Sequence, residues 1–254
     1  MSGASLKGTL AYVRRRVAEL ANDAGRNADD VRLIAVSKTR PAKAIRAARR
    51  YGQIDFGENY IQEWQDKAEE LEDIEDIQWH VIGALQSNKV RYVVGKAAVI
   101  HGVDRKKIID EIAGRAEKPQ PIIIQVNLSG EEQKSGCDPE MTEILVRHAI
   151  ESEYALPIGL MTIPPDDPDP EAARPYFRKL RELRDQIREN LEEDYPEAAQ
   201  QFKELSMGMS HDMQQAIEEG ATMVRIGTAI FGARPARGSY NPSLEDELPQ
   251  EMQG

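Results

Sequence analysis

Cysteine, long apolar runs and spaced metal ligands are scarce or absent in this sequence of 254 residues. The single cysteine, Cys137, excludes an internal disulfide, and no apolar stretch before a cleavage site marks the N-terminus for export, so a cytoplasmic location is expected. No apolar run approaches the roughly 18 to 20 residues that span a bilayer, so no membrane association is expected. The four histidines lack metal-ligand spacing, and no metal site is expected.

Excess positive charge is also lacking, because the formal net charge is −11 and the pI is near 5.0. Such a balance disfavours attraction to phosphate backbones, so nucleic acid is not an expected partner. Neither a phosphate-loop lysine motif nor a dinucleotide glycine fingerprint occurs. Residues 208–212 (GMSHD) begin like a hydrolase nucleophile elbow, but Asp212 stands where the second glycine belongs.

The chain does contain a repeated alternation of short β-rich runs and helical segments. Several runs, such as residues 122–126 (IIIQV), are largely continuous in apolar character, which is typical of parallel strands covered by helices. Eight such units in a chain of this length favour a single-domain α/β fold, a (β/α)8 TIM barrel, over an open doubly wound sheet. The predicted strands are residues 32–37, 54–57, 78–83, 98–103, 121–127, 157–163, 203–207 and 223–227.

Both ends of the chain depart from the repeated pattern of strands and helices. Residues 5–24 form an apolar stripe at alternating spacings of four and three, which predicts an extra N-terminal helix that packs on the barrel. An alternative is that this stripe docks a partner protein. We expect a barrel domain over residues 1–233 and an irregular acidic tail over residues 234–254, which carries several prolines and no periodicity.

Functional groups of a parallel barrel gather where its strands end, and Lys38 lies at the end of the first one. Its ammonium would emerge from an apolar core, where desolvation lowers a lysine pKa and favours an imine-forming amine. The simpler alternatives are a lysine that reaches solvent or one that pairs with Glu58.

A second group of candidates follows the seventh and eighth strands, which form the recurrent phosphate site of this fold. Gly208, Ser210 and Gly227 are small enough to expose backbone amides there, although Ser210 alternatively caps a helix. Arg225 is a permanent charge near the end of a buried strand and therefore requires a partner. A pyridine nitrogen or a carboxylate would serve.

These pieces together resemble a known family, the YggS-like pyridoxal 5′-phosphate (PLP) homeostasis proteins, also called proline synthetase co-transcribed homologues. The resemblance runs from about residue 5 to residue 233, and one departure is Val81, where the family more often carries a larger side chain. The segments that carry it are residues 35–39 (AVSKT), 56–60 (FGENY), 79–89 (WHVIGALQSNK), 133–136 (QKSG), 159–163 (GLMTI), 205–210 (LSMGMS) and 224–228 (VRIGT).

The resemblance implies a barrel similar to the N-terminal domain of alanine racemase, with PLP held as an internal aldimine on Lys38. It also implies that Ser210, Gly227 and Thr228 contact the cofactor phosphate and that Arg225 faces the pyridine nitrogen. Asn59 is expected to border the cofactor.

Arg225 bears on whether such a protein is an enzyme. An arginine donates hydrogen bonds only, so it keeps the ring nitrogen unprotonated and makes PLP a weak electron sink. The resemblance further implies that the second base of a racemase comes from an added β-rich domain, for which the sequence after the barrel leaves no room. We therefore expect a non-enzymatic monomer that acts in vitamin B6 homeostasis, with PLP-dependent enzymes as recipients of the cofactor. The alternative is a PLP-dependent amino-acid racemase.

Overall fold

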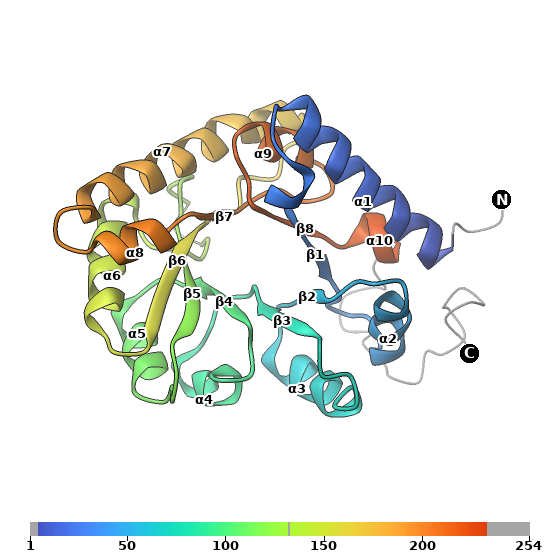
Figure 1. Ribbon diagram of the computed structural model, residues 1–254, viewed down its shortest axis with the longest axis horizontal. Helices are drawn as coiled ribbons and strands as arrows, with labels where there is room; N and C mark the ends of the chain where they lie inside the picture. Colours follow the sequence, from blue (N-terminus) through green and yellow to red (C-terminus); the bar gives the residue numbers. More distant parts are fainter. Residues whose placement is uncertain (1–4, 132, 233–254) are drawn as a thin grey trace.

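The β-rich segments pair in chain order into a closed barrel of parallel strands, which confirms the predicted TIM barrel (Figure 1). The computed structural model of the chain describes residues 5–131 and 133–232. The strands are β1 (Arg32–Val36), β2 (Asp55–Glu58), β3 (Gln78–Val81), β4 (Val99–Val103), β5 (Gln120–Gln125), β6 (Ala155–Met161), β7 (Glu204–Ser206) and β8 (Met223–Ile226).

Each predicted strand overlaps an observed one, and no end differs by more than two residues. The third strand shows why the ends are hard to predict. It ends at Val81, and the backbone just beyond packs closely on Asn59, since a Cβ atom on Gly83 would lie 2.3 Å from the Asn59 carbonyl oxygen. Such contacts between loops are not encoded in local periodicity.

Helices surround the barrel, as Figure 1 shows. Pro41 occupies the N-cap position of the helix that follows β1, and Asp169 caps a short 3-10 turn that leads into the longest helix after β6. The helices are α1 (Leu6–Asp23), α2 (Ala42–Arg50), α3 (Ile61–Glu70), α4 (Val90–Val93), α5 (Lys106–Ala113), α6 (Pro139–Glu151), α7 (Arg174–Leu191), α8 (Pro196–Gln201), α9 (Met213–Glu218) and α10 (Thr228–Phe231), with 3-10 turns η1 (Ala28–Asp30), η2 (Ser87–Lys89) and η3 (Pro170–Ala173).

The N-terminal helix α1 packs its apolar stripe onto the barrel, against α9 and α10. The stripe residues, from Leu6 to Leu20, are only 1% to 4% exposed. Burial of each such side chain stabilises the fold by about 1.5–3 kcal/mol. The Thr9 hydroxyl also donates to the Ile230 carbonyl at 2.8 Å. The predicted packing is confirmed, and the alternative of a stripe that docks a partner is wrong.

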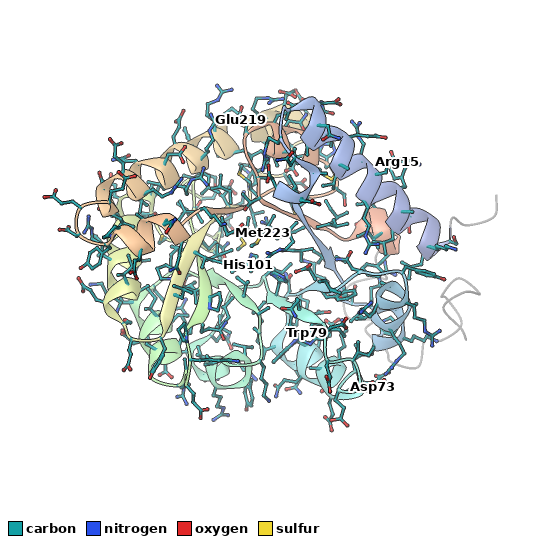
Figure 2. All side chains as sticks on the ribbon, in the orientation of Figure 1. Arg15, Asp73, Trp79, His101, Glu219 and Met223 are labelled. Atoms are coloured by element: carbon teal, nitrogen blue, oxygen red, sulfur yellow. The ribbon has the colours of Figure 1, made fainter. Side chains whose placement is uncertain are left out.

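Apolar side chains fill two regions, a large layer between strands and helices and a small cluster inside the barrel. Figure 2 shows Met223 of this inner cluster near the centre of the barrel, beside His101. His101 is fully buried, so polar groups share the barrel interior with the apolar cluster.

Two predictions concern the C-terminal region. The tail expected over residues 234–254 lies outside the described residues, as does residue 233, so the domain boundary at 233 stays a prediction. Within residues 5–131 and 133–232, no helix combines the length and apolar character needed to cross a membrane.

Candidate cofactor site

The strand register gathers the predicted site residues at one edge of the barrel. In the β1–β8 pair, Ala35 lies opposite Ile226, and in the β1–β2 pair, Val36 lies opposite Gly57. The segments that leave these strands therefore start side by side at the carboxyl-terminal edge. Lys38, Asn59 and the pair formed by Gly227 and Thr228 belong to these segments, and Ser210 follows the adjoining strand β7.

Lys38 lies in a turn with an unusual backbone. It is half-buried and follows the fully buried Ser37. The next residue, Thr39, has a φ of 64°, a left-handed conformation that is rare for a β-branched residue. Its N–H donates to the Glu63 carboxylate at 2.5 Å. This contact holds the turn in a conformation that its own residues do not favour.

A buried lysine, Lys67 of α3, is the centre of the group that holds the turn. Its Nζ lies 2.7 Å from the Ser37 carbonyl oxygen and 2.6 Å from a carboxylate oxygen of both Glu58 and Glu63. The Ser37 hydroxyl donates to the same Glu58 oxygen at 2.7 Å. We call Glu58, Glu63 and Lys67 the clamp, because they bind the residues on both sides of Lys38.

The clamp buries two carboxyl groups and one ammonium, and the largest exposed fraction among them is the 8% of Glu63. Burial raises the pKa of Glu58 to about 7, the nearby Lys67 lowers it and Glu63 raises it further. Among the described residues, Glu58 Oε2 has no hydrogen-bond partner. The sequence offered Glu58 as a partner for Lys38, and in the structure its other oxygen accepts from Lys67 and Ser37.

The turn after β7 has a geometry that only glycine accommodates at its first position. Gly208 has a φ of 92°, and a Cβ atom there would lie 2.5 Å from the Ala216 side chain. Asp212 accepts from the Met209 N–H at 2.6 Å and occupies the N-cap position of α9. Ser210 is exposed and does not cap the helix, so the capping alternative is wrong.

The turn after β8 leads directly into α10. Gly227 occupies its N-cap position, and Thr228 is its first residue and is exposed. The first N–H groups of a helix have no partner within it, so they are available to an anion. A Cβ atom on Gly227 would lie 3.3 Å from the Val36 carbonyl oxygen, so this turn packs closely on the end of β1.

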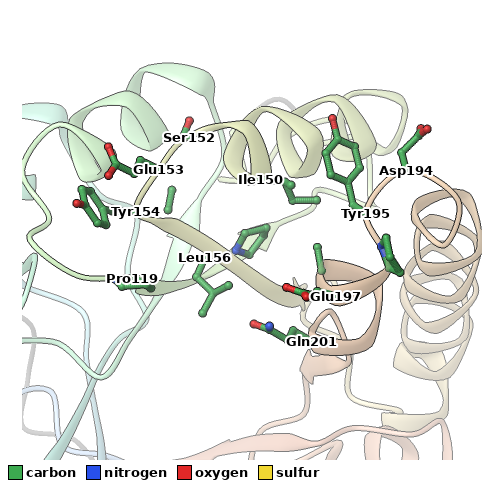
Figure 3. A pocket seen from close by; sticks show the side chains of 14 residues that line it. Pro119, Ile150, Ser152, Glu153, Tyr154, Leu156, Asp194, Tyr195, Glu197 and Gln201 are labelled. Carbon is green, nitrogen blue, oxygen red and sulfur yellow. The ribbon is translucent and has the colours of Figure 1, made fainter.

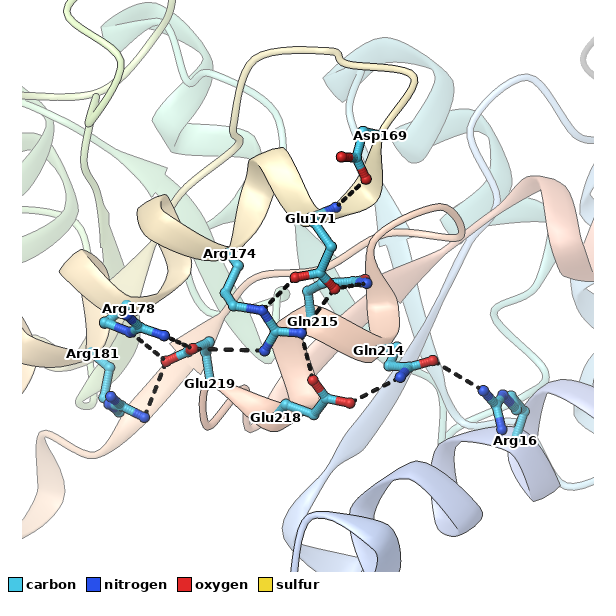
Figure 4. Close-up of polar contacts among 10 residues, drawn as sticks. All are labelled: Arg16, Asp169, Glu171, Arg174, Arg178, Arg181, Gln214, Gln215, Glu218 and Glu219. Atoms are coloured by element: carbon cyan, nitrogen blue, oxygen red, sulfur yellow. Dashed lines mark hydrogen bonds and ion pairs between the residues drawn. The ribbon is translucent and has the colours of Figure 1, made fainter.

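Ion pairs fix α9, which follows the turn of residues 208–210, to the long helix α7 (Figure 4). Arg174 contacts Glu171 at 2.7 Å and Glu218 at 2.6 Å. Glu219 accepts from Arg178 at 2.9 Å and contacts Arg181 at 3.2 Å. The candidate phosphate turn thus rests on a helix that is anchored on its outer side.

Arg225 is the charged group inside the mouth of the barrel. Its side chain donates to the Ser206 hydroxyl at 2.8 Å and to the Thr162 carbonyl at 3.1 Å. Burial lowers its pKa to about 10, although the nearby carboxylate of Asp212 raises it. Both partners are uncharged, and a guanidinium has five N–H donors. Among the described residues, no carboxylate pairs with Arg225, so donors remain for a further acceptor.

Two of the hollows formed by the described residues lie at opposite edges of the barrel. One of about 340 Å³ lies at the mouth, beside Met209 and Asp212, and Lys134 and Ile163 contribute to its wall. A hollow of about 490 Å³ lies at the opposite edge, between the start of β6 and α8, and Tyr154 lines it (Figure 3). The larger one therefore lies away from Lys38, and the smaller one adjoins the candidate phosphate turn.

Comparison with known proteins gives a consistent result. The alanine racemase N-terminal domain family matches residues 9–235. Proteins named pyridoxal phosphate homeostasis protein from Aquifex aeolicus and Pseudomonas aeruginosa are 46% and 42% identical over 228 residues, which is 89% of this chain and 96% and 94% of theirs.

Solved structures agree with this result. PipY of Synechococcus elongatus, described both without and with PLP, is 34% identical with a TM-score of 0.77, and the match covers 90% of this chain and 100% of PipY. Alanine racemase from Corynebacterium glutamicum is 14% identical with a TM-score of 0.61, and the match covers 91% of this chain and 62% of the racemase. The racemase likeness shows a shared fold only.

Proposed function

The chain belongs to the pyridoxal phosphate homeostasis proteins of the alanine racemase N-terminal domain family, and we propose that it binds PLP at the mouth of its barrel and serves the homeostasis of this cofactor. The relatives bear that name, and PipY, of similar length, is described with PLP bound.

The residues at the mouth fit the three functional groups of the cofactor. Lys38 supplies an amine for the aldehyde carbon. Ser210, Thr228 and the backbone N–H groups beside Gly227 supply donors for the phosphate. Asn59 borders the same edge. The observation that carries the proposal is Arg225, a buried guanidinium with donors to spare and uncharged partners, which suits an uncharged ring nitrogen.

Arg225 also supports a carrier over an enzyme. When bound, PLP supplies an electron sink that stabilises negative charge on an amino acid, and it does so most strongly when its ring nitrogen is protonated. The guanidinium donates a hydrogen bond without giving up its proton, because even its lowered pKa of about 10 lies well above neutral pH. We infer that the protein holds and releases PLP as a non-catalytic monomer and that PLP-dependent enzymes receive the cofactor.

The first test is the visible spectrum of the purified protein with added PLP, followed by borohydride reduction and peptide mapping. We expect one reduced pyridoxyl group on Lys38, and Lys38→Ala should lose the absorption of the lysine adduct while it retains weak PLP binding. Lys89→Ala is a matched control, because Lys89 follows β3 at the same edge. An adduct on another lysine, or equal absorbance in Lys38→Ala and the wild type, would contradict the proposal.

A racemase is the second candidate, because the family model that matches residues 9–235 is the N-terminal domain of alanine racemase. It predicts exchange of the amino-acid α-proton in deuterated buffer that depends on Lys38. We expect no such exchange above the rate given by free PLP. Exchange well above that rate, abolished by Lys38→Ala, would replace the carrier proposal.

A further inference from the structure

A chain of buried polar groups crosses the barrel interior and ends at Arg225. Asp55 Oδ1 lies 3.0 Å from His80 Nε2, and His80 Nδ1 lies 2.9 Å from His101 Nε2. His101 Nδ1 lies 2.9 Å from Ser206 Oγ, which accepts from Arg225 at 2.8 Å. The step from His101 on β4 to Ser206 on β7 crosses from one side of the barrel to the other.

The two ends of this chain lie at opposite edges of the barrel. Asp55 is the first residue of β2, and its side chain is 15% exposed at the amino-terminal edge, where Arg32 lies 3.9 Å away. Arg225 belongs to the last strand and lies at the mouth. The two histidines and Ser206 between them are at most 1% exposed, so water does not interrupt the chain.

Hydrogen-bond chemistry fixes the direction of every link. A carboxylate only accepts, so His80 donates from Nε2 to Asp55, and the Nδ1 of a neutral His80 then accepts from His101 Nε2. A neutral His101 accepts at Nδ1, which requires the Ser206 hydroxyl to donate to it. Arg225, which only donates, completes the series at the other end. All donors therefore point from Arg225 towards Asp55.

These directions require both histidines to be neutral, and the surroundings of both favour the neutral ring. Burial is the main cause that lowers the pKa of His80, although Asp55 and Glu204 raise it and Arg32 lowers it further. Burial lowers the pKa of His101 well below its usual value, and the neighbouring His80, Arg225 and Arg32 lower it further. When both rings are neutral and carry their proton on Nε2, every imidazole nitrogen of His80 and His101 has a hydrogen-bond partner.

We propose that Asp55, His80, His101 and Ser206 are positioning residues for Arg225, and that their aligned hydrogen bonds transmit the negative charge of Asp55 across the barrel to the guanidinium. Aligned hydrogen bonds polarise one another in a low-dielectric interior, so the carboxylate of Asp55 adds through them to the direct attraction between Asp212 and the buried guanidinium. The hydrogen bond to His101 also fixes the orientation of the Ser206 hydroxyl, and a lone pair of its oxygen then accepts from Arg225 and orients the guanidinium. The role towards PLP rests on the proposed function, whereas the hydrogen-bond direction does not.

The direction of the chain can be tested without PLP. Side-chain ¹⁵N NMR of the full-length protein at pH 7 distinguishes the two neutral tautomers and the charged form of each histidine. The substitutions His148→Gln and His211→Gln remove the signals of the other two histidines. We expect the Nε2–H tautomer for both His80 and His101. An Nδ1–H tautomer or a charged ring at either position would overturn the proposed direction.

The transmission of charge is tested by PLP binding and by the absorption of the lysine adduct. Asp55→Asn keeps an acceptor for His80 but removes the charge, and we expect PLP affinity to fall by about threefold to tenfold. Asp55→Glu should restore most of it. Glu204→Gln removes the same charge at the first residue of β7, outside the chain, and should change affinity by less than about twofold.

Equal changes in PLP affinity for Asp55→Asn and Glu204→Gln would overturn the proposal that the hydrogen bonds transmit the charge, because through-space electrostatics would then explain both changes. Thermal unfolding of each variant without PLP identifies any general loss of fold. If the wild type formed no lysine adduct at all, the proposed function would fail, whereas the NMR result would still decide the hydrogen-bond direction.

Discussion

At the scale of single residues, Glu58 combines two opposite influences. Burial disfavours its charged form, and the adjacent Lys67 favours it, with the net result that its pKa rises to about 7. The folded protein therefore binds a proton on Glu58 more tightly than the unfolded chain does. Such a group contributes stability that is present below the unfolded pKa near 4.5 and is lost as the pH rises towards 7.

We predict that Glu58→Gln becomes more stable relative to the wild type as the pH rises from 5 to 8. The amide keeps an acceptor for Lys67 and Ser37 but has no charge to desolvate. The relative gain should be on the order of 1–3 kcal/mol. Urea unfolding at both pH values measures it, and Glu69→Gln on the exposed face of α3 is the control. A difference independent of pH would show that Glu58 is fully ionised throughout.

At the scale of elements, α3 supports the turn after β1 through the clamp. Glu63 and Lys67 are four residues apart, a spacing that on an exposed helix stabilises weakly. Here Lys67 is fully buried, and Glu63 is 8% exposed. Loss of the ammonium would leave two buried carboxylates without their counter-charge and the Ser37 carbonyl without this donor.

Lys67→Met should therefore destabilise the protein by about 3–5 kcal/mol, the cost of breaking a buried ion pair on one side. It should also reduce the yield of the Lys38 adduct at a temperature where the variant remains folded. Lys107→Met, on the exposed face of α5, is the control. Unfolding curves that coincide for Lys67→Met and the control would contradict the role of the clamp.

The anchor of α9 should respond to acid. The side-chain hydrogen bond from Arg174, with a second from Gln215, lowers the pKa of Glu171 to about 2. A lowered carboxyl pKa contributes stability above the unfolded value near 4.5, and this contribution is lost as the pH falls towards 2. We expect acid unfolding in fixed urea to be less steep in this range for Glu171→Gln than for the wild type. Identical slopes would rule out this contribution.

At the scale of the whole molecule, α1 ties the first part of the chain to the last. Leu10 lies on the buried face of α1 and is 1% exposed. Leu10→Ala should lower the free energy of unfolding by about 2–5 kcal/mol, because the surrounding side chains cannot fully close the cavity that the substitution leaves. Tyr12→Ala on the exposed side of the same helix is the control, since Tyr12 is 58% exposed. A Leu10→Ala variant as stable as Tyr12→Ala would contradict the packing of the stripe.

The barrel was predictable because its strands are local apolar runs, and the positions of Lys38, Asn59, Ser210, Arg225, Gly227 and Thr228 followed from the ends of those strands. Their contacts with PLP stay predictions. The clamp was missed because Glu63 and Lys67 resemble an ordinary exposed helical pair. The series of hydrogen bonds that ends at Arg225 was missed because its residues are distant in sequence. His80 and His101 are 21 residues apart, and His101 and Ser206 are 105 apart.

The contact between α1 and α10 has a consequence for how the protein is made. The hydrogen bond from Thr9 to Ile230 joins residues 221 positions apart, so it forms only when nearly the whole described chain has left the ribosome. Synthesis proceeds at about 5–20 residues per second, and Lys38 is thus available many seconds before Arg225 and the turns after β7 and β8. In the proposed binding mode, a nascent chain therefore offers PLP the amine of Lys38 before the residues of the candidate phosphate site are made. Retention of PLP would therefore mark a chain whose translation has passed α10.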